Sequence, residues 1–271
     1  MGTPTSADRT DDDARRQWRS WRRAREEAVS APGGPLALTG THWLDDAAPG
    51  GELPGVPGRW AVDGEELVLS AAAADGLRVD GRPLDGTARL GTDAGPESAR
   101  VTSGARRLVV LRREGRWAVR VFDPDAPARH AFRGIDAFGY DARWAVPAVY
   151  RPYPDSRAVR VANADGRRRG LHLAGEVVFT VGGAEHRLAA VAEDDGALWI
   201  VLADGTSGGS SYRFRFLRPG VPGPDGALTL DFNRALLPPC AFADHFICPF
   251  PPPGNTLPFD VPAGERNLTG G

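Results

Sequence analysis

The feature that most constrains the fold is a run of short apolar segments separated at close intervals by glycine, proline and aspartate. Segments of about four to eight residues bounded by such turn formers are typical of β-strands. Consecutive strand candidates without intervening helices favour a closed antiparallel sheet, because closure removes exposed strand edges. We therefore expect a barrel-like C-terminal region with strands at residues 146–150, 158–162, 175–181, 186–191, 198–202, 212–217 and 228–232.

The first 35 residues divide into two parts. Residues 1–13 are small, polar and charged, which predicts a flexible tail. Residues 14–35 begin with good helix formers, carry Trp18 and Trp21 at helical spacing, and end in a Pro-Gly-Gly-Pro stop. We expect a helical clasp there that docks its tryptophans on the body of the protein, with a partner-binding helix as the alternative.

Strand-and-turn patterning continues over residues 36–122, where Arg113-Glu114-Gly115 predicts a hairpin turn, and it indicates a β-sandwich-like region. A proline-rich, aromatic bridge at residues 123–145 leads to the barrel-like region at residues 146–271. The last part of that region, from Pro238 onward, is proline-rich and holds both cysteines, so we expect it to wrap the barrel as a closing loop. The predicted fold is mostly β: an N-terminal helix, a β-sandwich-like region and an antiparallel β-barrel-like region.

All 33 basic side chains are arginine, and the absence of lysine limits the chemistry. A chain without lysine cannot form a lysine Schiff base, anchor pyridoxal phosphate, or build the usual lysine-containing phosphate loop. Arginine stays protonated and is a poor proton shuttle. Any general base must therefore be an aspartate, glutamate, histidine, tyrosine or cysteine.

The charge balance limits the classes of partner that the protein can bind, and the apolar pattern limits where in the cell it can lie. A formal net charge of −2 argues against a nucleic-acid or anionic-membrane surface. No apolar run is long enough to span a bilayer, and the N-terminus lacks the apolar stretch of a signal peptide. We expect a cytoplasmic protein whose partner is a small molecule, and the oligomeric state stays open.

Several long motifs stand out: LTGTHWL at 38–44, DPDAPARHAF at 123–132, DGTSGGSSY at 204–212, RFL at 215–217, LDFNRALLPPCAF at 230–242, CPFPPPGN at 248–255 and AGE at 263–265. Together they resemble the motifs of a bacterial family called domain of unknown function 1684, which has no assigned biochemistry. Leu236 and Leu237 stand where the family motif has tyrosine and asparagine, which implies a more apolar pocket in this chain.

The first candidate site is a polar cluster at the predicted strand ends. Its arginines can clamp an anionic or carbonyl-bearing substrate, and its aspartates can act as acid or base. Strict alternation puts Asp231 and Arg234 on opposite faces, so a bend must bring them to one pocket. A buried structural ion-pair network is the alternative. The catalytic candidates are Asp231 and Arg215, and the ligand-binding candidates are Asp204, Ser207, Tyr212, Asn233, Arg234, Leu236 and Leu237.

Cys240, His245 and Cys248 form the second candidate site. Their C-x4-H-x2-C spacing offers three zinc ligands, and three ligands plus a water are the pattern of a catalytic zinc. Cys240 can instead be a catalytic nucleophile with His245 as its base, and the cysteines can also form a redox pair or pack as small apolar residues. His172, in an alternating segment, is a further candidate base if it faces into the barrel.

These candidates predict a small-molecule-binding β protein that performs cofactor-independent acid–base chemistry, such as isomerisation, cyclisation, elimination or hydrolysis. One alternative is a binding protein in which the same barrel-like region holds a hydrophobic ligand without catalysis. Another is a zinc-dependent hydrolase that uses Cys240, His245 and Cys248, and zinc is the one cofactor considered. A structural or partner-binding protein is the third, and a buried polar cluster with no cavity beside it would favour that interpretation.

Overall fold

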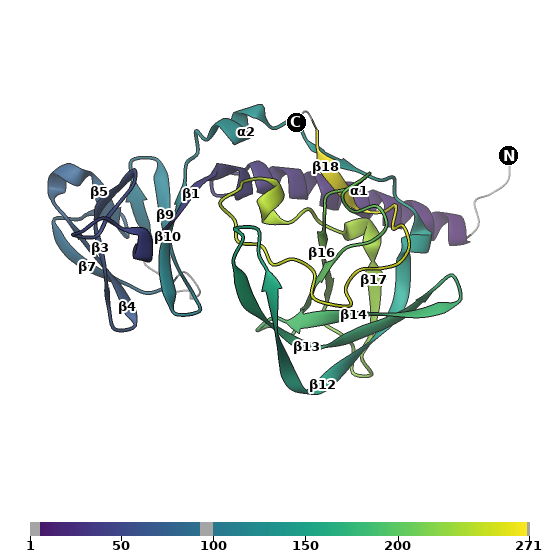
Figure 1. The fold of residues 1–271 in the computed structure, drawn as a ribbon. Helices are drawn as coiled ribbons and strands as arrows, with labels where there is room; N and C mark the ends of the chain where they lie inside the picture. The colour runs from purple at the N-terminus through teal and green to yellow at the C-terminus, as the bar shows by residue number, and fades with distance from the viewer. Residues whose placement is uncertain (1–5, 93–99, 270–271) are drawn as a thin grey trace. The chain divides into compact units, whose positions relative to one another are not determined.

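The computed structural model describes residues 6–92 and 100–269, and the chain divides into two compact units (Figure 1). We call Met1–Glu27 with Arg133–Gly271 the barrel unit, and Ala28–Phe132 the sandwich unit. The predicted fold class is confirmed, because strands dominate and a helix precedes them. Among the described residues, no helix carries an apolar stretch long enough to cross a membrane.

Helix α1 (Ser6–Ser30) begins earlier than the sequence predicts. The tail expected at residues 1–13 is therefore wrong from Ser6 onward, and residues 1–5 lie outside the described part. Asp11 pairs with Arg15 one turn later at 3.2 Å, and such pairs stabilise a helix. A polar, charged composition that resembles a flexible tail is thus compatible with a helix.

One face of α1 docks on the barrel unit, as the clasp prediction requires. Trp18 is buried, and its Nε1 donates a hydrogen bond to the carbonyl oxygen of Asn233 at 2.9 Å. Arg25 donates from Nε to Oε1 of Glu265 and from Nη2 to the carbonyl oxygen of Leu237, each at 3.1 Å. The helix is therefore tied to the C-terminal segment by polar bonds as well as by an aromatic contact.

The sandwich unit consists of two antiparallel sheets, in the orders β1-β10-β9-β8-β5-β6 and β2-β3-β4-β7. Both sheets contribute to one core, where Trp60 and Leu69 of the smaller sheet cluster with Val110 and Trp117 of the larger. This is the sandwich-like region that the alternation predicts. Its elements are η1 (Pro35–Ala37), β1 (Leu38–Trp43), η2 (Leu44–Asp46), β2 (Glu52–Leu53), β3 (Val56–Asp63), β4 (Glu66–Ala71), η3 (Ala73–Asp75), β5 (Leu77–Val79), β6 (Arg82–Pro83), β7 (Gly86–Leu90), β8 (Val101–Ser103), β9 (Arg106–Arg113), β10 (Arg116–Phe122) and α2 (Pro127–Ala131).

The barrel unit is built on a six-stranded antiparallel sheet in the order β16-β15-β14-β13-β12-β17. Its edge strands β16 and β17 approach each other, so the sheet is a nearly closed barrel (Figure 1). Fully buried side chains such as Val177, Leu188, Ile200 and Leu230 fill the interior, as expected for a small barrel. The elements are β11 (Ile135–Ala137), η4 (Ala142–Trp144), β12 (Ala145–Ala162), β13 (Arg168–Val181), β14 (Ala184–Ala192), β15 (Leu198–Leu202), β16 (Arg215–Gly220), β17 (Ala227–Asp231), η5 (Phe232–Arg234), η6 (Pro239–Ala241) and β18 (Glu265–Leu268).

Two strands predicted at residues 146–150 and 158–162 are one strand, β12. Pro152 and Pro154 lie between these segments, and proline cannot donate to a sheet ladder. The pairing of β12 with β13 shifts register between Pro152 and Arg157, and this irregularity lets the strand continue past the prolines.

The segment predicted as a bridge, residues 123–145, contains the boundary between the two units. Helix α2 lies on the sandwich side of that boundary, and β11 lies on the barrel side. Strand β11 pairs with β18 to form a separate two-stranded sheet, so the end of the chain returns to the start of the barrel unit.

Candidate functional site

Arg215, the first residue of β16, is the centre of the predicted polar cluster and is fully buried. Its Nη2 lies 2.6 Å from Oδ2 of Asp204 and donates to the carbonyl oxygen of Val261 at 3.0 Å. Its Nη1 donates to the carbonyl oxygens of Ala263 and, at 3.4 Å, Glu265. One carboxylate and three carbonyls therefore engage the guanidinium, and these bonds fix the segment before β18 to the barrel.

Asp204 is held as a buried anion beside Arg215. Its Oδ1 accepts hydrogen bonds from the backbone N–H and the hydroxyl of Thr206, at 2.8 and 2.7 Å, and from the N–H of Val261 at 3.2 Å. Burial by itself raises the pKa of Asp204, but the Arg215 charge and the Thr206 bonds outweigh it, so the pKa lies below its ordinary value. Because its bonds are made within the protein, this carboxylate is poorly placed to take a proton from a substrate.

Three of the predicted ligand-binding residues serve local structure instead. The Ser207 hydroxyl accepts a hydrogen bond at 3.1 Å from a backbone N–H of its own turn. Leu236 exchanges two backbone hydrogen bonds with Phe216, at 2.7 and 2.9 Å. Leu237 is buried, and its N–H donates to Oε2 of Glu265 at 2.6 Å. The backbone of each leucine is thus held by hydrogen bonds, and neither leucine lines either of the two cavities described below.

The turn η5 supplies the bend that the sequence requires between Asp231 and Arg234. Nε of Arg234 lies 3.2 Å from Oδ2 of Asp231, and both side chains are partly exposed. Asn233 lies buried between them, and its amide bonds the backbone N–H and carbonyl of Asp141 at 3.0 and 2.9 Å. Asp231 also accepts hydrogen bonds from the backbone and side chain of Asn233, so it caps η5.

The catalytic candidates do not converge on one pocket. Asp231 and Arg215 belong to two separate hydrogen-bonded groups. His172 is exposed on β13, whereas its neighbours Leu171 and Leu173 are buried. The expected orientation of His172 into the barrel is therefore wrong, because strand alternation places it on the solvent face.

The zinc site considered as an alternative for Cys240, His245 and Cys248 is not formed in the described residues. Both cysteines are buried thiols, and His245 is exposed. Within residues 6–92 and 100–269, no three His, Cys, Asp or Glu side chains are placed to hold a metal ion. The chain turns between the two cysteines, so the histidine points to solvent while both sulfurs point inward.

Cys240 lies in a polar microenvironment within an otherwise apolar cluster. The pKa of Cys240 is lowered to about 7, chiefly by a hydrogen bond from the Cys248 thiol, with burial opposing the shift. The hydroxyl of Tyr212, which precedes β16, lies 3.8 Å from Sγ of Cys240. Burial and the neighbouring Cys240 raise the pKa of Tyr212 to about 12, so the phenol stays protonated and can donate.

Two cavities of molecular size occur in the described residues, and none of the predicted site residues lines either one. A cavity of about 580 Å³ lies at the end of the barrel where β12 begins and β13 ends, beside Trp144, Val181 and Pro262. A cavity of about 720 Å³ lies in the sandwich unit. The polar cluster of Arg215 and Asp204 is buried and neither residue lines either cavity, which favours a structural role for the cluster. The larger of these two cavities, in the sandwich unit, is therefore the candidate ligand site.

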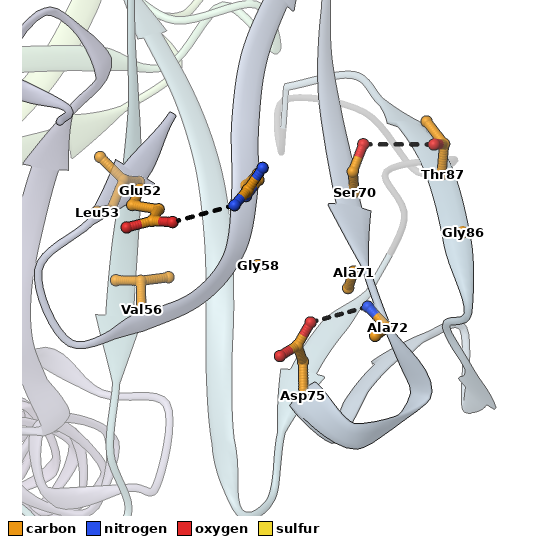
Figure 2. A pocket seen from close by; sticks show the side chains of 11 residues that line it. Glu52, Leu53, Val56, Gly58, Ser70, Ala71, Ala72, Asp75, Gly86 and Thr87 are labelled. Carbon is orange, nitrogen blue, oxygen red and sulfur yellow. Dashed lines mark hydrogen bonds and ion pairs between the residues drawn. The ribbon is translucent and has the colours of Figure 1, made fainter. Parts of the chain in front are cut away.

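The sandwich cavity is formed by β2, β3, β4 and β7 with the turn η3 (Figure 2). Its wall is polar, with Oγ of Ser70 3.3 Å from Oγ1 of Thr87, and Oε1 of Glu52 3.5 Å from Nη2 of Arg59. The Asp75 carboxylate accepts a hydrogen bond from the N–H of Ala72 at 2.8 Å, which fixes it at the start of η3. The remaining lining includes the buried side chains Leu53 and Val56, so the cavity combines charged groups, hydroxyls and an apolar floor.

Gly58 explains how β3 passes this cavity. Its φ is +84°, and a Cβ there would approach Cδ1 of Leu69 to 2.7 Å. Only glycine accepts both that backbone conformation and that close approach. No motif in the sequence marks this cavity, because its residues come from short strands and a turn. The available signal was the concentration of polar residues at the ends of those strands.

Residues 130–266 match the family described as Protein of unknown function (DUF1684). The chain belongs to this family. The match covers the motifs of the barrel unit, so the resemblance inferred from them is confirmed. An uncharacterized protein of Haloarcula marismortui, solved by solution NMR, is similar at 32% identity over 51% of this chain and 78% of that chain, with a TM-score of 0.43. No curated protein matched the chain.

Proposed function

We propose that this member of the DUF1684 family binds a small polar organic molecule in the cavity of the sandwich unit. The observation that carries the proposal is the cavity itself, about 720 Å³ with a polar wall and an apolar floor. Sites for small molecules typically measure about 300–1,000 Å³. The volume therefore suits a ligand of one or two rings.

The groups in the wall favour a neutral or cationic ligand with several hydroxyls. Glu52 and Asp75 supply two carboxylates against the single guanidinium of Arg59, which already lies near Glu52. The hydroxyls of Ser70 and Thr87 can each donate and accept hydrogen bonds. A monosaccharide, an amino sugar or a related polyol presents complementary hydroxyls, and its C–H face suits the apolar floor.

Binding without catalysis is favoured over acid–base catalysis by the placement of the predicted catalytic groups. A general base must come within hydrogen-bond reach of the proton it removes. Asp231 and Arg215 make their bonds within the barrel unit, His172 faces solvent, and neither cavity is lined by any of them. These placements favour ligand binding over catalysis, but in the sandwich unit and for a polar ligand, whereas the sequence predicted a hydrophobic ligand in the barrel.

A cytoplasmic location belongs to the same proposal. Two cysteines in 271 residues are too few for the disulfide framework of many small secreted proteins, which suits a reducing compartment. The near-balanced charge supports a small molecule as the partner.

Saturation-transfer NMR on the full chain tests the proposal with a panel of hexoses, hexitols, amino sugars and, for contrast, small carboxylic acids. We expect transfer to neutral or amino sugars and none to the acids. Ala72→Trp should abolish transfer, because Ala72 lines the cavity, and Ala73→Trp should preserve it, because Ala73 is exposed outside the lining. No transfer to any sugar or polyol, or equal transfer in both variants, would contradict the proposal.

A further inference from the structure

Cys240 and Cys248 lie together in the barrel unit, apart from the proposed ligand site. The N–H of Cys240 donates to Sγ of Cys248 at 3.3 Å. Since the N–Cα bond is about 1.46 Å, Cα of Cys240 lies within about 4.8 Å of that sulfur. Both residues are buried, and each keeps 6% of its surface exposed. Rotation of the Cys240 side chain can bring the two sulfurs into bonding distance.

The backbone around the two cysteines is fixed on both sides, so their proximity is built into the fold. The turn η6 is closed by hydrogen bonds to the carbonyls of Pro238 and Pro239, at 2.9 and 3.0 Å. Beyond the turn, the carbonyl of Cys248 accepts from the N–H of Ala164 at 2.9 Å, which ties this part of the chain to the end of β12. A disulfide needs Cα atoms about 4.4–6.8 Å apart, and a closed turn between anchored ends is suited to that spacing.

The surroundings of Cys240 favour its thiolate form. Tyr212 places its hydroxyl 3.8 Å from Sγ, and the Arg213 guanidinium stacks over Phe250 at 4.7 Å from the ring centre. Hydrogen bonding from Cys248 is the largest cause of the lowered pKa, burial opposes it, and Tyr212 and Arg213 add to it. Thiolates are the nucleophiles in sulfur chemistry, so Cys240 is the attacking residue and Cys248 the resolving one.

We propose that Cys240 and Cys248 are a redox-active pair that a peroxide converts into an intramolecular disulfide. The Cys240 thiolate attacks one oxygen of hydrogen peroxide, the O–O bond breaks, and the hydroxide that leaves takes a proton to become water. The sulfenic acid on Cys240 is then attacked by the Cys248 sulfur, the S–O bond breaks, and a second water leaves. Two thiols lose two electrons in total, and one peroxide is reduced to two waters.

A purely structural role for the two cysteines does not explain the polar groups around Cys240. Cysteine is often buried as a small apolar residue, and both cysteines do contact an aromatic cluster that includes Phe214 and Phe216. An inert buried thiol in apolar surroundings has a raised pKa. The thiol and phenol donors around Cys240 have the opposite effect, and they are the arrangement that an oxidisable cysteine needs.

Mass spectrometry of the peroxide-treated, thiol-blocked full chain tests the proposal. Because the chain has no lysine and no arginine between Arg234 and Arg266, trypsin leaves both cysteines in one peptide, residues 235–266. We expect that peptide to lose the mass of two hydrogens and to take up no alkylating reagent, while the chain stays monomeric on a non-reducing gel. In Cys248→Ser, dimedone should label Cys240, and in Cys240→Ser, Cys248 should stay unlabelled under the same exposure.

Three results would overturn the proposal: a disulfide between two chains, oxidation of Cys240 to the sulfinic acid without a disulfide, or equal dimedone labelling in both serine variants. The wild-type measurement decides the question even if a serine variant fails to fold. Failure here leaves the proposed ligand site intact, since the two sites lie in different units and the assays share no readout.

Discussion

Replacing Arg215 with methionine removes the cation at the centre of the buried polar cluster while keeping most of the side-chain volume. The variant leaves the Asp204 carboxylate buried without its counter-ion, and it deprives the carbonyls of Val261 and Ala263 of their donors. Removing one partner of a buried ion pair costs about 3–5 kcal/mol. For a domain of this size, each kcal/mol of lost stability lowers the melting temperature by about 2–4 °C, so we expect a fall on the order of 10 °C.

Urea unfolding followed by circular dichroism measures the loss, with Arg218→Met as the matched control. Arg218 lies on the same strand as Arg215, but its side chain is 49% exposed and pairs with Glu193 at the surface. An exposed pair contributes about 0–1 kcal/mol. The double variant Asp204→Asn, Arg215→Met should recover part of the loss, because it also removes the Asp204 charge that Arg215→Met leaves without a counter-ion. If Arg215→Met costs no more than Arg218→Met, the cluster is not a structural lock and our reasoning about it is refuted.

Three further predictions concern other groups of the barrel unit. Asn233→Ala should lower the free energy of unfolding by roughly 1–3 kcal/mol, because it leaves the partly buried backbone N–H and carbonyl of Asp141 without their side-chain partners. The exposed His172→Ala should change that free energy by less than about 0.5 kcal/mol in the same urea titration. Equal effects of the two substitutions would contradict the burial assigned to Asn233. Burial raises the pKa of Glu265 above its ordinary value of 4.5, so the stability that Glu265 contributes is full below pH 4.5 and is lost as pH rises through the raised pKa. From pH 4 upward, the free energy of unfolding should therefore decline less in Glu265→Gln than in the wild type. Parallel declines in the two proteins would be evidence against the raised pKa. The pH midpoint for iodoacetamide labelling of Cys240 should lie near 7 in the wild type and rise in Cys248→Ala, because this substitution removes the thiol hydrogen bond that lowers the pKa of Cys240 most. An unchanged midpoint would exclude that hydrogen bond as the cause.

Local patterns predict local structure well in this chain. The turn expected at Arg113-Glu114-Gly115 is present, since Arg113 pairs with Arg116 and the two residues between them have φ of +49° and +78°. Positive φ at both loop residues matches a two-residue hairpin turn, which glycine at the second position favours. The bend between Asp231 and Arg234 could likewise be inferred, because alternation left no other way to pair them.

The structural role of the polar cluster could not be predicted from local sequence patterns, because it depends on contacts between residues far apart in the chain. Arg215 donates hydrogen bonds to the carbonyl oxygens of Val261 and Ala263, which lie far along the chain. Whether those carbonyls face Arg215 is decided by the path of the last segment around the barrel. The same arginine beside an open cavity would have been a substrate clamp. Similarly, alternation fixes that His172 and its leucine neighbours face opposite sides of β13, but only the packed barrel decides which side is buried.

The most direct test of ligand binding in the sandwich unit is a backbone amide NMR titration with the hexose or amino sugar that gives the strongest saturation transfer. We predict that the shifted resonances belong to the cavity lining, including Leu53, Ala71 and Thr87, and that Ala72→Trp removes those shifts. Shifts that fall instead on the barrel unit, around Asp204 and Arg215, would contradict the proposed site and restore the polar cluster as the ligand-binding region.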